Sequence, residues 1–446
     1  HHPDLPVTVV DAPRGQVVLI GYVTDPRRPA APEEQILAEM ARCSGDVLAV
    51  ARLADDLVGR YLLVWLGVDR EWVLSDAAGG RQAVHTLYGG GVAVASGPAL
   101  LAEHVGAAPD GGALAWTASD AYRGMRGGSW WPGVATPWAG VRRLLPNRVL
   151  DLRSGQVRRV LPPPKDVRLP VGELRTLLQR TVRGSLEAMA SRAPLTLLLT
   201  AGADSRLLLA GARTVLDRLQ LVTIRNPEGS TEDVEIAQQM TADLGLDHQT
   251  VQAVPPPATF MALYRAQDGP GNAGYAANAH ALLPCTAGRV AVTGHVAGVV
   301  KAGLGGARFA RRPTAGRLAL ETHMGTHPFA LQAWQEWLRD DPGATGYPVH
   351  DLAYWENRVG SWAAGWSAEY DLVWDDVMWP LASRRLLCAM LAHQSRRGQN
   401  VQRVLWPEVT RSWWPEVAGY PLGGNPPVRR SLVARVRRSL GYLRAR

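Results

Sequence analysis

The sequence is poor in lysine and cysteine. Only two of its 48 basic residues are lysines, Lys165 and Lys301. Its three cysteines, Cys43, Cys285 and Cys388, lie far apart and form no Cys-x-x-Cys pair. This pattern excludes a disulfide framework and a cysteine-based zinc site, and it fits a reducing compartment.

Long apolar runs and targeting signals are also missing. No run approaches the roughly 20 apolar residues of a membrane-spanning helix, and no secretory signal is recognisable. We therefore expect a cytoplasmic protein without a transmembrane segment. With 446 residues, 46% of them hydrophobic, the chain is long enough for two or three domains with buried cores. Its formal net charge of +8 favours acidic partners such as nucleotides, although a GC-rich genome also produces many arginines.

Short β-rich runs separated by Gly, Asp and Pro dominate the first 160 residues. The pattern predicts strands at 17–23, 46–52, 59–66, 71–76 and 91–96, and a helix at 33–43. It is typical of an α+β sandwich domain over residues 1–160. The proline-rich stretch 161–170 that follows is expected to be a linker.

Strands and helices alternate after residue 171. The pattern predicts strands at 195–200, 219–224, 248–254 and 289–293, with helices between them and a long amphipathic helix at 171–190. Such alternation predicts a doubly wound parallel sheet. The second domain, residues 171–446, is therefore expected to be α/β, with a helical, tryptophan-rich part from about residue 320. Ligands of these sheets bind at the carboxyl ends of the strands.

One strand of this domain is joined to a helix by a loop of small and polar residues. The loop consists of Thr200, Ala201, Gly202, Ala203, Asp204, Ser205 and Arg206. The three small residues let backbone N–H groups approach a ligand, and the helix that follows directs its positive end at the loop. The two hydroxyls add donors, and Asp204 is suited to hold Mg²⁺ against a pyrophosphate. The alternative is a plain turn in which Asp204 caps the helix.

The loop 200–206 resembles the pyrophosphate-binding loop of the N-type ATP pyrophosphatases. It is most similar to the Ser-Gly-Gly-x-Asp-Ser loop of the asparagine synthetase family, and it is not a Walker P-loop. Two later stretches, 221–226 and the Leu-Gly-Leu-Asp-His turn at 244–248, also resemble that family. In the first domain, Gly-Arg-Tyr at 59–61 and Asp-x-x-Gly-x-Arg at 76–81 are similar to the family's glutaminase-like, Ntn-type sandwich.

The resemblance implies an ATP-dependent ligase that adenylates a carboxylate and transfers the acyl group to an amine, with ATP and Mg²⁺ as cofactors. It implies that the loop holds the pyrophosphate and that Asp204 is the metal ligand. Arg206 is expected to bridge a phosphate or to pair with Asp204. Further nucleotide contacts are implied at the ends of neighbouring strands, at Val222, Thr223, Ile224 and Gly294.

The position of the first cysteine departs from the family pattern. Asparagine synthetases hydrolyse glutamine with an N-terminal cysteine, whereas Cys43 lies well inside the first domain. Glutamine hydrolysis is therefore not expected. Branches without that cysteine resemble β-lactam synthetases and lasso-peptide macrolactam synthetases, which use an amine already present in the substrate. We accordingly expect a small-molecule or peptide substrate, with a precursor peptide as a candidate partner, and a role in natural-product biosynthesis.

Two charged groups of the family's active site are missing as well. Gly298 stands where the family has the aspartate of its Gly-x-Gly-x-Asp-Glu loop, and residues 398–424 contain no lysine for the family's Arg-x-Lys. The candidates to replace them in catalysis are His295, Lys301 and Arg403.

Two alternatives remain open at this point. The missing charges are compatible with a non-catalytic nucleotide-binding or scaffold relative. A basic amphipathic stretch at 428–446 is compatible with a tRNA-modifying enzyme of the same fold, but no RNA-binding signature accompanies it. Nucleic acid is therefore not the expected partner.

Overall fold

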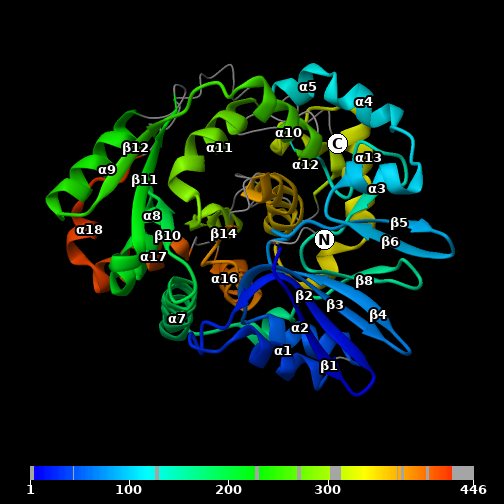
Figure 1. The fold of residues 1–446 in the computed structure, drawn as a ribbon, viewed down its shortest axis with the longest axis horizontal. Helices are drawn as coiled ribbons and strands as arrows, with labels where there is room; N and C mark the ends of the chain where they lie inside the picture. Colours follow the sequence, from blue (N-terminus) through cyan, green and yellow to red (C-terminus); the bar gives the residue numbers. More distant parts are fainter. Residues whose placement is uncertain are drawn as a thin grey trace.

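The computed structural model describes most of the chain. The described residues are 5–43, 45–125, 130–226, 231–268, 273–301, 313–368, 370–372, 376–397 and 401–423. The basic stretch predicted at 428–446 lies outside them. Figure 1 shows an antiparallel sheet in blue at the lower right and a parallel sheet in green at the left, with helix α16 (Arg384–Arg397) between them.

A six-stranded antiparallel sheet forms the centre of the N-terminal part, in the order β1-β2-β3-β4-β8-β9. These strands are β1 (Val7–Ala12), β2 (Gly15–Thr24), β3 (Val58–Gly67), β4 (Glu71–Ser75), β8 (Arg148–Asp151) and β9 (Val157–Arg159). Helices α1 (Glu33–Ala41) and α2 (Val47–Ala54) pack with one face of this sheet in a shared apolar core. The other face packs against a three-stranded sheet, formed by β5 (Val84–Tyr88), β6 (Gly91–Ala95) and β7 (Arg142–Arg143). This arrangement agrees with a sandwich, and its likeness to an Ntn-type glutaminase stays a prediction.

The strand predicted at 46–52 is wrong, because this segment forms helix α2. Its buried residues, Val47, Val50, Ala51 and Ala54, recur at helical spacing, so a single face of the helix meets the sheet. Asp46 caps the helix by accepting a hydrogen bond from the backbone N–H of Leu48 at 2.9 Å. The other predicted N-terminal strands and the helix at 33–43 are confirmed.

The second part is built on a five-stranded parallel sheet in the order β12-β11-β10-β13-β14. Its strands are β10 (Leu195–Leu198), β11 (Leu219–Arg225), β12 (His248–Gln252), β13 (Val290–Val292) and β14 (Asp376–Met378). The four predicted strands and the parallel sheet are confirmed. Sequence reasoning missed β14, which is only three residues long.

The remaining helices surround the three sheets. They are α3 (Pro98–Val105), α4 (Gly111–Thr117), α5 (Asp120–Arg123), α6 (Pro164–Val167), α7 (Val171–Ala190), α8 (Ala203–Gly211), α9 (Thr231–Asp243), α10 (Ala258–Asp268), α11 (Ala273–Thr286), α12 (Ala315–Glu321), α13 (Pro328–Arg339), α14 (Val349–Ala353), α15 (Ala364–Ala368), α17 (Gln402–Trp413), α18 (Pro415–Gly419) and a π-helix at Tyr354–Ala363. The chain is therefore helical after residue 313 where it is described, apart from β14, as expected.

The predicted linker 161–170 is packed against the second part. It contains the short helix α6, whose Val167 is buried, and Arg168 donates a hydrogen bond to the carbonyl of Ala392 in α16 at 3.0 Å. These contacts hold the segment in place, so it is not a free connection.

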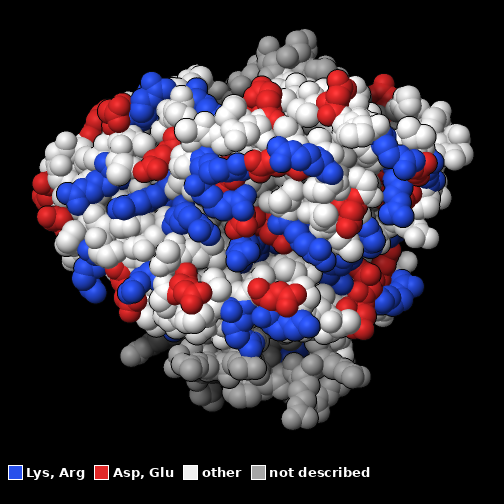
Figure 2. All heavy atoms as spheres, turned by 90° about the horizontal axis from the view of Figure 1, so that it is seen from below, with Lys and Arg blue, Asp and Glu red and all other residues white. Residues whose placement is uncertain are grey.

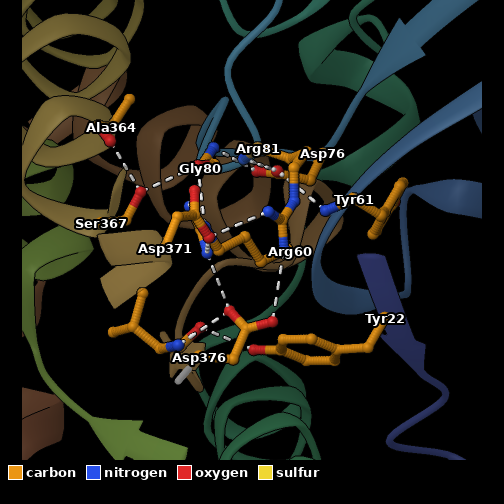
Figure 3. A network of polar contacts seen from close by, with 11 residues as sticks. Tyr22, Arg60, Tyr61, Asp76, Gly80, Arg81, Ala364, Ser367, Asp371 and Asp376 are labelled. Atoms are coloured by element: carbon orange, nitrogen blue, oxygen red, sulfur yellow. Dashed lines mark hydrogen bonds and ion pairs between the residues drawn. The ribbon is translucent and has the colours of Figure 1, made fainter. Parts of the chain in front are cut away.

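An ion-pair network joins the two parts (Figure 3). Arg60 donates to Asp371 Oδ2 at 2.6 Å and to Asp376 Oδ1 at 3.1 Å, and Arg81 binds the same two carboxylates at 3.1 and 3.3 Å. Burial would raise the pKa of Asp371, but the charges and hydrogen bonds of Arg60 and Arg81 lower it overall. Asp76 shapes the 76–81 turn by accepting four backbone N–H bonds. The N-terminal motif residues therefore hold the two parts together.

The surplus of positive charge is not gathered into one patch on the face drawn in Figure 2, where acidic side chains lie among the basic ones. Among the described helices, none is long and apolar enough to cross a membrane.

Candidate functional site

The loop 200–206 lies at the middle of the parallel sheet's carboxyl edge. It leaves β10, the central strand, and runs directly into α8, with Gly202 as the N-cap residue. The strands on either side of β10 are β11 and β13, so their ends flank the loop. The first N–H groups of a helix have no partner within it, and here they belong to the half-buried residues Ala203 and Asp204. The predicted position of the loop is confirmed.

Hydrogen bonds within the loop fix its shape. The Ser205 hydroxyl donates to the carbonyl of Thr200 at 2.8 Å and accepts from the backbone N–H of Thr200 at 3.1 Å. The Thr200 hydroxyl accepts from the backbone N–H of Gly202, also at 3.1 Å. Ser205 is buried, whereas Thr200 is exposed. The hydroxyls therefore brace the loop, and the side chain of Thr200 is the one open to solvent.

Asp204 is the point where distant parts of the chain meet. The ammonium of Lys301 forms an ion pair with its Oδ2, and the indole of Trp406 donates to its Oδ1 at 2.9 Å. A Cβ atom on Gly294, just after β13, would lie 2.8 Å from the Cβ of Asp204, so this close approach requires glycine. The structure thus brings together three predicted site residues, Asp204, Gly294 and Lys301.

Lys301 reaches Asp204 because a short 3₁₀ helix, His295–Lys301, follows β13. Val299 and Val300 in this helix are fully buried and anchor it. The side chain of Lys301 is 37% exposed and that of Asp204 is 22% exposed. The ion pair therefore lies at the boundary between the core and solvent, where a bound molecule can reach it.

Trp406 is a site residue that sequence reasoning missed. It is buried in α17, which packs beside α8. The only signal was its place in the segment 398–424, where the family closes its active site. Arg403, the predicted substitute for the family's lysine, precedes Trp406 by less than one helical turn but is exposed. Helix α17 therefore directs an indole to Asp204.

Arg206 is engaged by the end of the described chain. Its Nη1 donates to the carbonyl of Tyr420 at 2.5 Å, and its Nη2 donates to the carbonyl of Pro421. The predicted pair between Arg206 and Asp204 therefore does not form. The backbone N–H of Gly423 donates to the carbonyl of Ala201 at 3.2 Å, so the segment 420–423 crosses the loop.

The residues predicted at the end of β11 have different roles. The Thr223 hydroxyl donates to the carbonyl of Leu199 at 2.8 Å and lies 2.7 Å from Nε2 of His248, whose pKa burial lowers. Thr223 thus links β11 to the residue after β10 and to the first residue of β12. Val222 is fully buried, whereas Ile224 is half-buried. Contact of these residues with an adenine ring stays a prediction, and Ile224 offers the most surface for it.

His295 lies among aromatic side chains. Its ring centroid is 4.3 Å from that of Trp366 and 5.2 Å from that of Trp362, and its Nδ1 is 2.9 Å from the Thr293 hydroxyl. Burial, and secondly the charge of Arg358, lower the pKa of His295 to about 4. The ring is therefore neutral near pH 7 and packs the turn after β13, so it does not supply the charge that the predicted catalytic role of His295 requires.

Tyr354, at the start of the π-helix, fills the space beside Gly298. A Cβ atom on Gly298 would lie only 2.2 Å from the Tyr354 hydroxyl oxygen, so no carboxylate fits at this position. The pKa of Tyr354 is raised above its usual value, mainly by burial. The charge and hydrogen bond of Arg358 offset part of this rise, and the charge of Asp204 adds to it. The Tyr354 hydroxyl is therefore protonated near pH 7. Nothing in the sequence distinguished this tyrosine from the other aromatic residues around it.

These contacts test the predicted magnesium site. Mg²⁺ prefers oxygen ligands in octahedral geometry, but both oxygens of Asp204 already face donors, on Lys301 and Trp406. Within the described part of the chain, no three His, Cys, Asp or Glu residues are grouped as a metal site. The residues present do not fit a magnesium ion held by Asp204.

Parts of the chain are similar to known proteins. Residues 173–336 match the family model for asparagine synthase. Among solved structures, glutamine-dependent NAD⁺ synthetase from Acinetobacter baumannii with bound ADP is 20% identical over 36% of this chain and 31% of that one, with a TM-score of 0.22. NMN synthetase from Francisella tularensis is 12% identical over 51% of this chain and 97% of that one, with a TM-score of 0.21.

Both structural similarities are weak, and this chain spans less than a third of the Acinetobacter enzyme. No curated protein matches the sequence. The family match covers β10 to β13 and the loop between β10 and α8. The chain therefore carries an asparagine synthase domain at residues 173–336, a type of domain that points to an ATP-using carbon–nitrogen ligase.

Proposed function

We propose that the protein is an ATP-dependent ligase that activates a substrate carboxylate as an acyl-adenylate and joins it to an amine. The observation that carries this proposal is the loop 200–206 in an asparagine synthase domain, at the centre of the sheet's carboxyl edge and at the start of α8. A helix start of this kind favours bound phosphate groups. A carboxylate is a poor electrophile near pH 7, so amide formation needs the activation that ATP provides.

In this reaction a carboxylate oxygen attacks the α-phosphorus of ATP, and pyrophosphate leaves. The first N–H groups of α8 and the ammonium of Lys301 stabilise the negative charge that develops on the leaving group. The substrate amine then attacks the acyl carbon, loses a proton, and displaces AMP. Asp204 positions Lys301 for the first step, and Trp406 positions Asp204.

We propose that the amine comes from the substrate itself or from a second substrate, rather than from glutamine. Cys43 lies at the end of α1, where its thiol donates a weak hydrogen bond to the carbonyl of Met40 and where burial raises its pKa. Arg60 and Arg81 of the N-terminal motifs are already bound to acidic residues of the second part. A small molecule or a peptide, as in β-lactam or macrolactam formation, is the proposed substrate class. The free cysteines support a cytoplasmic location.

Formation of AMP and pyrophosphate from ATP tests the proposal. Purified protein is incubated with ATP, candidate carboxylates and hydroxylamine, which traps acyl-adenylates as hydroxamates. We expect AMP, pyrophosphate and hydroxamate in equal amounts, and a large loss of all three in Lys301→Ala. The exposed Lys165 is the only other lysine, so Lys165→Ala is a matched control that retains activity. Release of ADP and phosphate instead of AMP would contradict adenylation.

A nucleotide-binding relative without catalysis is a second candidate. The crossing of the loop by the segment 420–423 and the exposed position of Arg403 favour it. Such a protein would bind ATP in calorimetry and yet form no AMP with any carboxylate. Truncation after Tyr420 removes the contact of Gly423 with the loop and so separates an enzyme from a non-catalytic relative. If the segment 420–423 blocks an active enzyme, the truncated protein forms more AMP, whereas a non-catalytic relative still forms none.

A further inference from the structure

Side chains of the protein already engage both oxygens of the Asp204 carboxylate. Oδ2 of Asp204 is neutralised by the Lys301 ammonium, and Oδ1 accepts from the Trp406 indole. An ion placed on this carboxylate would face a positive charge on one side and an N–H donor on the other. Both groups would have to leave before Asp204 could become a metal ligand.

The surroundings of Gly298 are also unsuited to a divalent cation. The Tyr354 hydroxyl occupies the space beside Gly298, where a second carboxylate would have to extend. This hydroxyl is hydrogen-bonded to Arg358, whose guanidinium carbon lies 4.5 Å from the Trp362 ring centroid. A neutral hydroxyl and another positive charge thus stand where a metal site needs negative oxygen atoms.

Lys301 has the properties needed to act on phosphates directly. An ammonium has three N–H donors, and the ion pair with Asp204 uses one side of it while 37% of the side chain remains exposed. Buried Val299 and Val300 hold the preceding turn in place, so the charge is fixed beside the start of α8. A fixed positive charge next to a helix start attracts phosphate without a bound ion.

We infer that Lys301 supplies the positive charge that a divalent cation would otherwise bring to the phosphates, so that this site binds ATP in its metal-free form. The inference rests on the proposed binding of ATP at the loop 200–206. It goes further by assigning the ionic form of the nucleotide. It also gives Asp204 a new role, as the residue that orients Lys301 rather than as a metal ligand.

Calorimetric titration of the full chain with ATP tests the inference, in EDTA and in Mg²⁺ at equal ionic strength. We expect dissociation constants that agree within about threefold under the two conditions. Lys301→Ala should weaken binding in EDTA by at least tenfold, whereas Lys301→Arg, which keeps the charge, should retain most of it. Lys165→Ala is the matched control and should bind as the unchanged protein does. Circular dichroism confirms that each variant is folded.

Asp204→Asn provides an independent readout. If Asp204 orients Lys301, the variant binds metal-free ATP within a fewfold of the unchanged protein, and added Mn²⁺ gives no protein-bound signal in electron paramagnetic resonance with either protein. If Asp204 is a metal ligand, the unchanged protein binds Mn²⁺ and the variant does not, which overturns the inference.

The results of these titrations distinguish the binding of metal-free ATP from the proposed binding of ATP in any form. Binding of ATP only when Mg²⁺ is present overturns the inference and leaves the proposed function standing. Absence of ATP binding under both conditions overturns the proposed function, and the inference with it. Equal binding under both conditions, lost in Lys301→Ala, supports both.

Discussion

Lys301 and Asp204 form an ion pair although 97 positions separate them in the sequence. The pair joins the loop after β10 to the 3₁₀ helix after β13, and it spans the carboxyl ends of two neighbouring parallel strands. Because both groups are partly exposed, the pair adds at most about 1 kcal/mol to stability. The pair places the positive charge of Lys301 beside the start of α8, where such a charge favours a bound phosphate.

Trp406→Phe should weaken ATP binding as well as stability. The change removes the N–H donor that holds Asp204 Oδ1 while keeping an aromatic ring in the core. We expect a stability loss of about 1–3 kcal/mol from the smaller ring and the unpaired acceptor, and a severalfold rise in the dissociation constant of ATP. Urea denaturation and calorimetry measure the two effects.

Trp334→Phe is the matched control. Trp334 is also fully buried, but its Nε1 has no hydrogen-bond partner among the described residues. We expect a comparable loss of stability and unchanged ATP binding. Equal effects of both substitutions on ATP binding would show that Trp406 contributes only packing.

Gly294→Ala should distort the site from the other side. The added methyl group would lie 2.8 Å from the Cβ of Asp204, so the loop or the end of β13 must move. Overpacking of this kind costs about 1–3 kcal/mol, and we expect ATP binding to fall at least tenfold. In Gly172→Ala, near the start of α7, the added methyl group meets no atom within 4 Å, and this variant should be as stable as the unchanged protein or slightly more so. Binding of ATP by Gly294→Ala at full affinity would show that the loop is not the nucleotide site.

The position of the site could be predicted from sequence because it follows from topology. Parallel strands end at the same edge, so a loop after β10 and a turn after β13 must lie close together, and the close approach of Gly294 to Asp204 follows from that. By contrast, α17 delivers Trp406 from the far end of the chain, and nothing local marks which face of that helix will meet α8. Tyr354 is a similar case, because its position depends on how a π-helix packs.

The fold was predictable where strands were long and clearly periodic. Segment 46–52 was misread because its short apolar run fits a strand or a helix equally well, and only packing of α2 against the sheet decides between them. Strand β14 is no shorter than the correctly predicted β13, but it begins with the charged Asp376 and so lacks a purely apolar run, and it pairs with β13 from far along the chain. The ion pairs of Arg60 and Arg81 were likewise invisible, because their partners, Asp371 and Asp376, come from the other part of the chain.

The ion-pair network between the two parts should make stability sensitive to acid. The pKa of Asp371 is lowered in the folded state, so its contribution is present above the unfolded pKa of about 3.9 and is lost as the pH falls through the lower folded value. Asp371→Asn should therefore unfold more easily at pH 7 and show a shallower loss of stability below pH 4 than the unchanged protein. Urea denaturation at several pH values measures both. The exposed Asp120→Asn is the control, and an identical acid response in Asp371→Asn and the unchanged protein would contradict this role.

His295 should produce a second pH effect at milder acidity, with its own signature. Its folded pKa of about 4 lies below the value of about 6.5 expected for an unfolded histidine. Between these values the unfolded chain binds a proton that the folded chain does not, so stability falls as the pH drops from about 6.5 towards 4. In His295→Gln this slope should become shallower without vanishing, because burial also lowers the pKa of His85, to about 4, and that of His248. The exposed His104→Gln should keep the full slope. Because the ring is neutral across this range in the folded protein, AMP formation near pH 7 should also show no titration that His295→Gln removes; a step near pH 6–7 that vanishes in this variant would instead assign His295 to the chemistry.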